Sequence, residues 1–374
     1  MREAVLQGIL YLVLICPFCE RVYPGGSHDR CPEDGSPLYV VGDEVAARKA
    51  LGPGDIVAGK YELLEEIGHR TGAGRTFRAR QVQLQREVEL RLLPENTIVK
   101  PADHARFRRE VETWGRLRSD HLVRLYDSGF AEGNAPYMAL EYIDGGSAGE
   151  RLRLNGRSSV KLVQTVARHV LRALDAAHNA NVLHRDITPD AVIISVRPDG
   201  TTSCRLTGFG LAKHLGDDDD DPTAITMTGQ VVGSPAYMAP ETIMKGTLDP
   251  RTDLYALGVT LYELLAGERP FPGISLAELL AAHVRGVPVP IVQYRRDIPP
   301  SFRMFLERMI AKEPERRFQT ADEALSVLEF QADTGELNPR VHGNLTREQT
   351  LRRERLLMIL MGIATLVAIV ILWL

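Results

Sequence analysis

Two spacings of apolar residues alternate along the middle of the chain. Short strand-like runs, with apolar residues at or near alternate positions, predict strands; they cover residues 61–67, 87–93 and 137–142. Apolar residues that recur every three or four positions predict helices with one buried face; they lie within residues 107–117 and 163–174. The part of the chain from 61 to 200 therefore begins with strands and continues into helix.

The predicted helices differ in the density of their apolar faces. In the first, Phe107, Val111, Trp114 and Leu117 share one face, and charged residues fill the rest of each turn. The second has a denser apolar face, formed by Val163, Val166, Ala167, Val170, Leu171 and Leu174. Residues 250–330 are also predicted to be helical.

The longest uncharged apolar segment is Leu356–Leu374, nineteen residues without a charge. As a helix it would span roughly 28 Å, close to the membrane hydrocarbon thickness of about 30 Å. Arginines mark the cytoplasmic side of such a span, and here they are Arg347, Arg352, Arg353 and Arg355. We expect a single-pass C-terminal tail anchor with the preceding chain in the cytoplasm; a buried core helix is the alternative.

A second apolar run, residues 4–15, is shorter and includes Gln7 and Gly8. It has no small-residue cleavage site before Cys16, so we do not interpret it as a signal peptide. Two interpretations stay open. The start codon is assigned too early, or the run is a strand packed on the cysteine-containing segment that follows.

The composition of the chain excludes several classes of protein. Of the 374 residues, 44% are hydrophobic and 25% charged, as in a globular protein, which excludes wholesale disorder. The formal net charge of −4 lacks the basic footprint of a nucleic-acid binder, so no nucleic-acid partner is expected. Four cysteines are too few for a disulfide scaffold.

Three of these cysteines lie close together near the start of the chain. Cys16 and Cys19 form one pair, and Cys31 begins a second, incomplete pair. Two such pairs present four ligands to one tetrahedral ion, and thiolates favour zinc. Asp34 or His28 would be the fourth ligand. We predict a module that resembles a zinc ribbon; a degenerate ribbon without zinc is the alternative.

Between residue 61 and about residue 330, a series of short motifs resembles the bacterial branch of the eukaryotic-type serine/threonine protein kinases. The motifs follow the family order with nearly the family spacing. They are Ile67-Gly68 with Gly72 and Gly74, Val88-Glu89-Leu90-Arg91, Glu110, His184-Arg185-Asp186, Gly208-Phe209-Gly210, Ala239-Pro240-Glu241, Asp253 and Arg317. The resemblance implies a two-lobed α+β protein-kinase-like fold with ATP in the cleft.

The resemblance also implies roles for single positions. Asp186 occupies the position of the general base that accepts the proton of a substrate hydroxyl. Arg91 occupies the position of the strand lysine that pairs with the phosphates, and Glu110 that of the glutamate that pairs with this lysine. The nucleotide-pocket positions are Gly68, Gly72, Gly74, Glu141, Tyr142 and Ile193. In the family, the residue at Asp253 braces the catalytic loop, and Arg317 pairs with Glu241. The hydrophobic spine corresponds to Trp114, Leu125, His184 and Phe209.

Several charged positions of the family's catalytic apparatus are altered. The aspartate and asparagine that hold magnesium correspond to Gly208 and Ala191. Thr188 replaces the catalytic-loop lysine, and Arg91 the strand lysine. Glu89 replaces the alanine above the adenine ring, where a carboxylate without a partner would cost several kcal/mol. We therefore expect weakened ATP binding and no magnesium.

These replacements favour a catalytically impaired pseudokinase that acts as a signalling scaffold or regulator by binding a protein partner. The alternative is an active or residually active ATP-dependent kinase with atypical metal coordination, because Asp186 is retained. Within it, the role of the lysine could pass to Arg70, Arg75, Arg78 or Arg80. We predict that the acidic run 217–221 is a solvated loop; the other interpretations are mimicry of a phosphorylated activation loop and recruitment of a cation.

The sequence thus divides into five predicted segments. A turn-rich stretch around Gly52-Pro53-Gly54 separates the cysteine module from the regular pattern that follows. The segments are a zinc-ribbon-like module (1–45), a linker (46–60), a protein-kinase-like domain (61–330), a basic juxtamembrane segment (331–355) and a transmembrane helix (356–374).

Overall fold

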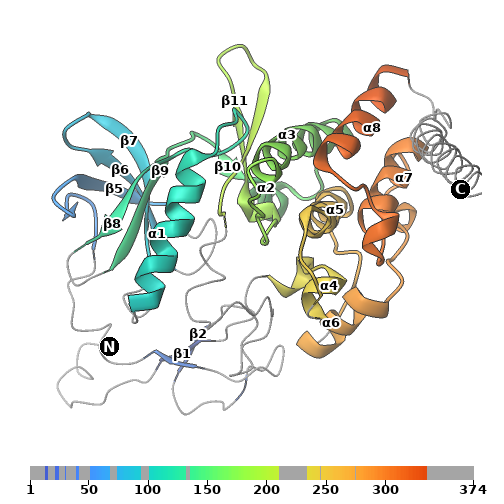
Figure 1. The fold of residues 1–374 in the computed structure, drawn as a ribbon, viewed down its shortest axis with the longest axis horizontal. Coiled ribbons are helices and arrows are strands. Elements are labelled where there is room, and N and C mark those ends of the chain that lie inside the picture. Colours follow the sequence, from blue (N-terminus) through green and yellow to red (C-terminus); the bar gives the residue numbers. More distant parts are fainter. Residues whose placement is uncertain are drawn as a thin grey trace, which may run out of the picture. The chain divides into compact units, whose positions relative to one another are not determined.

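The structure is a computed structural model (Figure 1). It describes residues 13–15, 22–24, 30, 39–41, 51–67, 74–93, 101–131, 135–209, 234–244, 246–273 and 275–334. Residues 1–328 form one compact unit and residues 329–374 a second. The described elements of the first unit form the two lobes that the sequence predicts.

The small lobe is an antiparallel sheet of six strands with one helix. The sheet order is β4-β5-β6-β7-β9-β8, and helix α1 packs beside β8. The elements are β4 (Ile56–Val57), β5 (Tyr61–Glu66), β6 (Arg75–Gln81), β7 (Arg86–Leu92), α1 (Pro101–Arg116), β8 (Leu125–Phe130) and β9 (Pro136–Glu141). The three predicted strands are confirmed as β5, β7 and β9, with ends that shift by one residue.

The large lobe is mostly helical, with a small antiparallel sheet in the order β10-β11-β12. Its strands are β10 (Gly146–Ser147), β11 (Val192–Val196) and β12 (Thr202–Leu206). The α-helices are α2 (Ala148–Asn155), α3 (Val160–His178), α4 (Pro240–Ile243), α5 (Pro250–Ala266), α6 (Leu276–Arg285), α7 (Pro300–Met309) and α8 (Ala321–Thr334). Short 3-10 turns are η5 (Pro189–Ala191), η6 (Pro235–Tyr237), η7 (Ile291–Gln293) and η8 (Pro314–Arg316).

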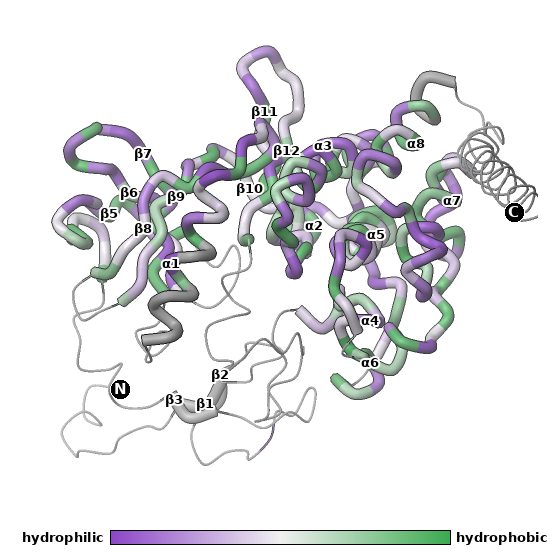
Figure 2. Tube along the Cα trace, in the orientation of Figure 1, coloured by the Kyte–Doolittle hydropathy of each residue, from purple (hydrophilic) through white to green (hydrophobic). Residues whose placement is uncertain are grey.

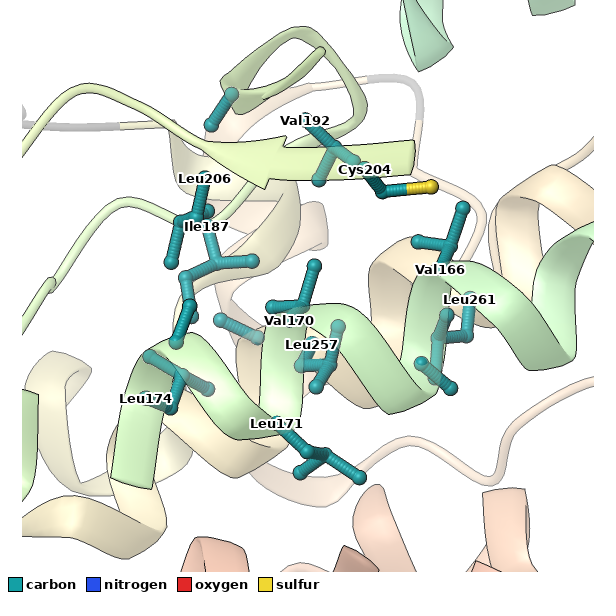
Figure 3. Packing of buried hydrophobic residues seen from close by; sticks show 14 of the residues in the cluster. Val166, Val170, Leu171, Leu174, Ile187, Val192, Cys204, Leu206, Leu257 and Leu261 are labelled. Atoms are coloured by element: carbon teal, nitrogen blue, oxygen red, sulfur yellow. The ribbon is translucent and has the colours of Figure 1, made fainter. Parts of the chain in front are cut away.

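Helices α3 and α5 form the centre of the large-lobe core. All six residues predicted for the apolar face of α3 are buried, which confirms that face. Figure 3 shows Val166 and Val170 of α3 close to Cys204 of β12 and Leu257 of α5. Figure 2 shows that hydrophobic residues also make up much of α5. The core therefore joins α3, α5, β11 and β12.

Three short strands are described near the start of the chain. They are β1 (Val13–Ile15), β2 (Val22–Pro24) and β3 (Tyr39–Val41), and they form a sheet in the order β2-β1-β3. Strand β1 agrees with the strand interpretation for the end of residues 4–15. The predicted zinc ligands lie outside the described residues; they are Cys16, Cys19, His28, Cys31 and Asp34.

The predicted membrane span, residues 356–374, also lies outside the described residues. Among the helices that the structure does describe, none combines the length and the apolar character needed to cross a bilayer. The tail anchor stays a prediction.

Candidate active site

The catalytic loop is held by a buried carboxylate on α5. Asp253, 1% exposed, accepts hydrogen bonds from His178 Nε2 and from the backbone N–H groups of His184 and Arg185, each at 2.8 Å. Burial by itself raises the pKa of Asp253, but these hydrogen bonds and the nearby histidines outweigh it, so the pKa is lowered. The brace that the resemblance implies is therefore present.

Asp186, the expected general base, is half-buried and lies two residues after His184 in this loop. Its Oδ1 accepts a hydrogen bond from the backbone N–H of Ser234 at 3.1 Å. Its own backbone N–H donates to His184 Nδ1 at 3.3 Å. The carboxylate thus meets the start of η6, a contact that the sequence did not predict because it joins residues forty-eight positions apart.

A series of tilted aromatic contacts connects the small lobe to this loop. The rings of Trp114 on α1 and Phe209 lie 5.9 Å apart, and those of Phe209 and His184 lie 4.6 Å apart. Trp114 Nε1 donates to the carbonyl of Val123 at 3.1 Å. Leu125 packs at the border of the same core. The four residues expected to form the spine therefore belong to one packed cluster.

The two expected magnesium-ligand positions lie side by side. The backbone N–H of Thr207, the residue before Gly208, donates to the carbonyl of Ala191 at 2.9 Å. Gly208 has a φ of +92° and no side chain, and the Ala191 methyl group is fully buried. Neither position supplies the side-chain oxygen that magnesium requires. Within the part of the chain that the structure describes, no three His, Cys, Asp or Glu side chains form a metal-binding group.

Glu89 and Arg91 form a buried ion pair on strand β7. The Glu89 Oε1 atom lies 2.7 Å from both Nε and Nη2 of Arg91. Arg91 Nη2 also donates to Thr207 Oγ1 at 2.8 Å, and Thr207 belongs to the large lobe. Because Arg91 pairs with Glu89, the burial of this carboxylate does not carry the cost of an unpaired charge. The two residues alternate on one strand, a spacing that could have indicated the pair.

Comparison with known proteins agrees with this geometry. Residues 61–328 match the family described as the protein kinase domain. The chain belongs to the protein kinase family. It is similar to the serine/threonine-protein kinase PknB of Mycobacterium leprae, with 32% identity over 267 residues, which is 71% of this chain and 42% of that protein. It is also similar to the serine/threonine-protein kinase pkn3 of Myxococcus xanthus, with 34% identity over 271 residues, which is 72% of this chain and 49% of that protein.

These relatives place the domain in the bacterial serine/threonine branch of the kinase family. The chain spans less than half the length of either relative. Among solved structures, the Mycobacterium tuberculosis PknI kinase domain matches with a TM-score of 0.58 and 25% identity. That match covers 75% of this chain and all of the PknI chain.

The remaining nucleotide positions of this kinase domain are partly described. Gly74 has a φ of +123°, and an added Cβ would collide with the carbonyl oxygen of Leu92, so only glycine fits there. Ile193 is 1% exposed within the large-lobe core. The predicted Gly68 and Gly72 lie outside the described residues.

Three further predicted positions have partners or a place in the kinase domain. Glu141 forms an ion pair with Arg205 of β12. The ring of Tyr142 faces the guanidinium of Arg78, with 5.2 Å between the guanidinium carbon and the ring centre. Glu110 lies on α1, but its side chain is outside the described part of the structure.

The sequence interpretation missed a second polar cluster in the catalytic loop. Ser147 Oγ donates to Asp190 Oδ1 at 2.6 Å, and Arg153 donates to both Asp190 oxygens at 3.0 Å. Gly149 packs so closely that an added Cβ would collide with the same carboxylate. Asp190 therefore joins the catalytic loop to α2, and its position next to Ala191 was the only signal in the sequence.

Proposed function

We propose that this chain is a membrane-anchored pseudokinase, which binds a protein partner as a signalling scaffold or regulator and does not transfer phosphate. The observation that carries the proposal is the identity of two residues that lie side by side in the fold, Gly208 and Ala191. Neither residue has a side-chain oxygen that could bind a metal. In protein kinases, the aspartate and asparagine at these places hold the two magnesium ions that neutralise the phosphates.

The expected loss of rate is large. Removing one preorganised charge from a catalytic site costs about 3 kcal/mol. Both metal ligands and the catalytic-loop lysine, at Thr188, are replaced, so the sum is about 9 kcal/mol, on the order of a million-fold in rate. Such losses do not add strictly within one functional unit. The sum still indicates that the remaining rate would be too slow for signalling, because kinases with a complete catalytic apparatus turn over only about 1–100 times per second.

Structural contacts of the domain persist where the catalytic charges are replaced. The guanidinium of Arg317 is fully buried and donates to both oxygens of Glu241 at 2.8 Å. Asp253 braces the catalytic loop, as described above. This combination supports a role for the domain as a binding surface.

A residually active serine/threonine kinase is the second candidate, and the retained Asp186 favours it. The full-length chain separates the two. We expect ATP with magnesium to leave the unfolding temperature unchanged relative to ATP with EDTA, because the side chains of Gly208 and Ala191 cannot hold the metal. We also expect radiolabel transfer from ATP to a generic protein substrate to equal that of Asp186→Asn. Magnesium-dependent stabilisation, with transfer that Asp186→Asn abolishes, would establish the kinase instead.

We propose further that residues 1–45 hold one zinc ion through Cys16, Cys19, Cys31 and either Asp34 or His28. Thiolate ligands support this choice of metal. Elemental analysis of full-length protein prepared without chelator should find close to one zinc per chain, and Cys16→Ser should lose it. Protein without zinc would mean that the module is degenerate.

A further inference from the structure

We propose that two stacked histidines beside strand β12, His121 and His169, form a binding site for a phosphate group that carries one proton. The ligand class is inorganic phosphate or a small phosphate monoester. No residue of the catalytic loop or of the expected nucleotide pocket belongs to this site. The inference therefore goes beyond the proposed function, and it holds whether or not the domain transfers phosphate.

The backbone of β12 holds both imidazole rings. This strand is the last one in the sheet β10-β11-β12, so one of its edges faces no other strand of that sheet. His121 Nδ1 lies 3.2 Å from the carbonyl oxygen of Cys204, and His169 Nδ1 lies 3.1 Å from the backbone nitrogen of the same residue. The side chain of Cys204 points into the core (Figure 3). The two rings stack, with 4.1 Å between their centres and 19° between their planes.

These two contacts decide which ring nitrogens carry protons. A carbonyl oxygen only accepts a hydrogen bond, so His121 Nδ1 donates and, in the neutral ring, Nε2 keeps a lone pair. A backbone N–H only donates, so His169 Nδ1 accepts and Nε2 carries the proton. Burial is the largest cause that lowers the pKa of both histidines, to about 4 for His169. Both rings are therefore mostly neutral at pH 7.

The stack thus offers a ligand one acceptor and one donor. Neither Nε2 atom hydrogen-bonds to a described residue, and neither is among the described side-chain atoms that are fully buried without a partner. A singly protonated phosphate has the complementary groups. Its P–OH can donate to His121 Nε2, while another of its oxygens accepts from His169 Nε2. Sulfate has the same shape and no proton to donate near neutral pH, so it matches only half of this pattern.

Arginines on two elements add positive charge around the stack. After burial and the neighbouring His121, the charges of Arg172 and Arg168 on α3 and of Arg197 after β11 lower the pKa of His169. The same charges attract an anion to this place. The field supplies attraction, and the two Nε2 atoms supply the preference for a ligand with a proton.

The remaining ionisable groups nearby do not supply that proton near neutral pH. Asp120, next to His121 in the chain, raises the pKa of that histidine. In the turn after β11, Asp199 accepts two hydrogen bonds from Thr201, which lower its pKa. Burial raises the pKa of the Cys204 thiol to about 12, although the charge of Arg151 opposes this. The proton belongs to the phosphate, whose monoesters have a second pKa of about 6. Binding therefore weakens as the pH rises and this proton is lost.

Equilibrium dialysis of the full-length chain with radiolabelled inorganic phosphate tests the site. We expect one phosphate per chain, bound about tenfold more weakly at pH 8 than at pH 6, because the singly protonated form becomes scarce. Sulfate at the same ionic strength should not displace it. Equal displacement by sulfate would overturn the proposal, since attraction to the arginines alone would then explain binding. A chain that retains no phosphate at pH 6 would overturn it as well.

Asparagine variants separate the ligand-binding atoms from the structural ones. The side-chain amide of asparagine reaches the place of Nδ1 in histidine and has no atom in the place of Nε2. His121→Asn therefore keeps a donor for the Cys204 carbonyl, and His169→Asn keeps an acceptor for the Cys204 N–H. Each variant should bind phosphate weaker than wild type by about tenfold or more. The matched control is His283→Gln, which changes a buried histidine of α6 and should bind phosphate as wild type does.

Thermal unfolding verifies that each variant is folded. Folded asparagine variants that bind phosphate as tightly as wild type would contradict the site. If a variant does not fold, the comparison of phosphate with sulfate, and of pH 6 with pH 8, decides the question on wild type alone. Competition with O-phosphoserine identifies the source of the ligand. Displacement at similar affinity supports a phosphate monoester, and no displacement supports free phosphate.

Discussion

Arg317 shows how one buried charge stabilises the large lobe. Beyond its ion pair with Glu241, it donates to the backbone carbonyls of Ala311, Lys312 and Arg251. Thr252 Oγ1 donates to the same carboxylate at 2.9 Å. A buried ion pair is tolerated when its polar atoms are satisfied in this way. The sequence predicted the partners through the resemblance, but the carbonyl acceptors are visible only in the fold.

His283 on α6 gives a pH dependence that can be measured. It is 1% exposed, and Tyr255 Oη lies 3.0 Å from its Nδ1. Burial, with a smaller contribution from the positive charge of Lys312, lowers the pKa of His283 to about 3. The unfolded chain takes up this proton near pH 6.5, before the folded chain does. Stability is therefore lost as the pH falls from about 6.5 toward about 3.

We expect His283→Gln to remove the contribution of this histidine to the pH dependence, which is the uptake of one proton on unfolding. Below pH 6.5, the free energy of unfolding of wild type should fall more steeply than that of the variant, by about 1.4 kcal/mol per pH unit. Urea titrations at pH 7, 6 and 5 measure the difference. Parallel profiles for the two proteins over this range would contradict the assignment.

At the scale of elements, periodicity predicted helices well when one face was polar. The buried face of α3 is an example. Helix α5 follows a different rule, because fourteen of its seventeen residues are buried. Its polar residues, such as Asp253 and Thr260, find hydrogen-bond partners in the catalytic loop. The sequence predicted only that this region is helical, since a helix that is covered all round has no polar face to reveal its orientation.

Gly258 allows α5 to approach α7 closely. A Cβ at this position would lie 2.6 Å from Met309 Cβ and 2.8 Å from a methyl carbon of Ile310. We expect Gly258→Ala to lower the free energy of unfolding by about 1–3 kcal/mol, the usual cost of overpacking. The control is Gly115 on α1, where an added Cβ meets nothing within 4 Å.

Gly115→Ala should instead raise the free energy of unfolding, by at most about 0.5–1 kcal/mol, because Gly115 lies in the last turn of α1 and glycine in a helix is less favourable than alanine. Urea unfolding of the two single variants tests both signs at once. A neutral or stabilising effect of Gly258→Ala would show that the contact between α5 and the end of α7 relaxes easily.

At the scale of the whole molecule, membrane attachment is the prediction that the sequence makes most directly. Deleting residues 356–374 should move the protein from the membrane pellet to the supernatant, because the uncharged segment is removed. Cell fractionation with immunoblotting measures this, and deletion of residues 4–15 is the control that should stay in the pellet. A tail-deleted protein that still sediments with membranes would identify the earlier apolar run as the anchor.

The sequence by itself determined the family, three strands of the small lobe, the buried face of α3, and the absence of side-chain oxygens at Gly208 and Ala191, because these depend on residue identity and short-range spacing. It did not determine the order of elements: strands followed by helix were predicted for residues 61–200, but β8 and β9 follow α1, and β11 and β12 follow α3. Tertiary structure alone decided which charges meet. Asp186 accepts a hydrogen bond from the backbone N–H of Ser234, and Arg91 donates one to Thr207 of the large lobe. Such contacts require the packing of two lobes, since short-range spacing does not say which distant residue closes a hydrogen bond.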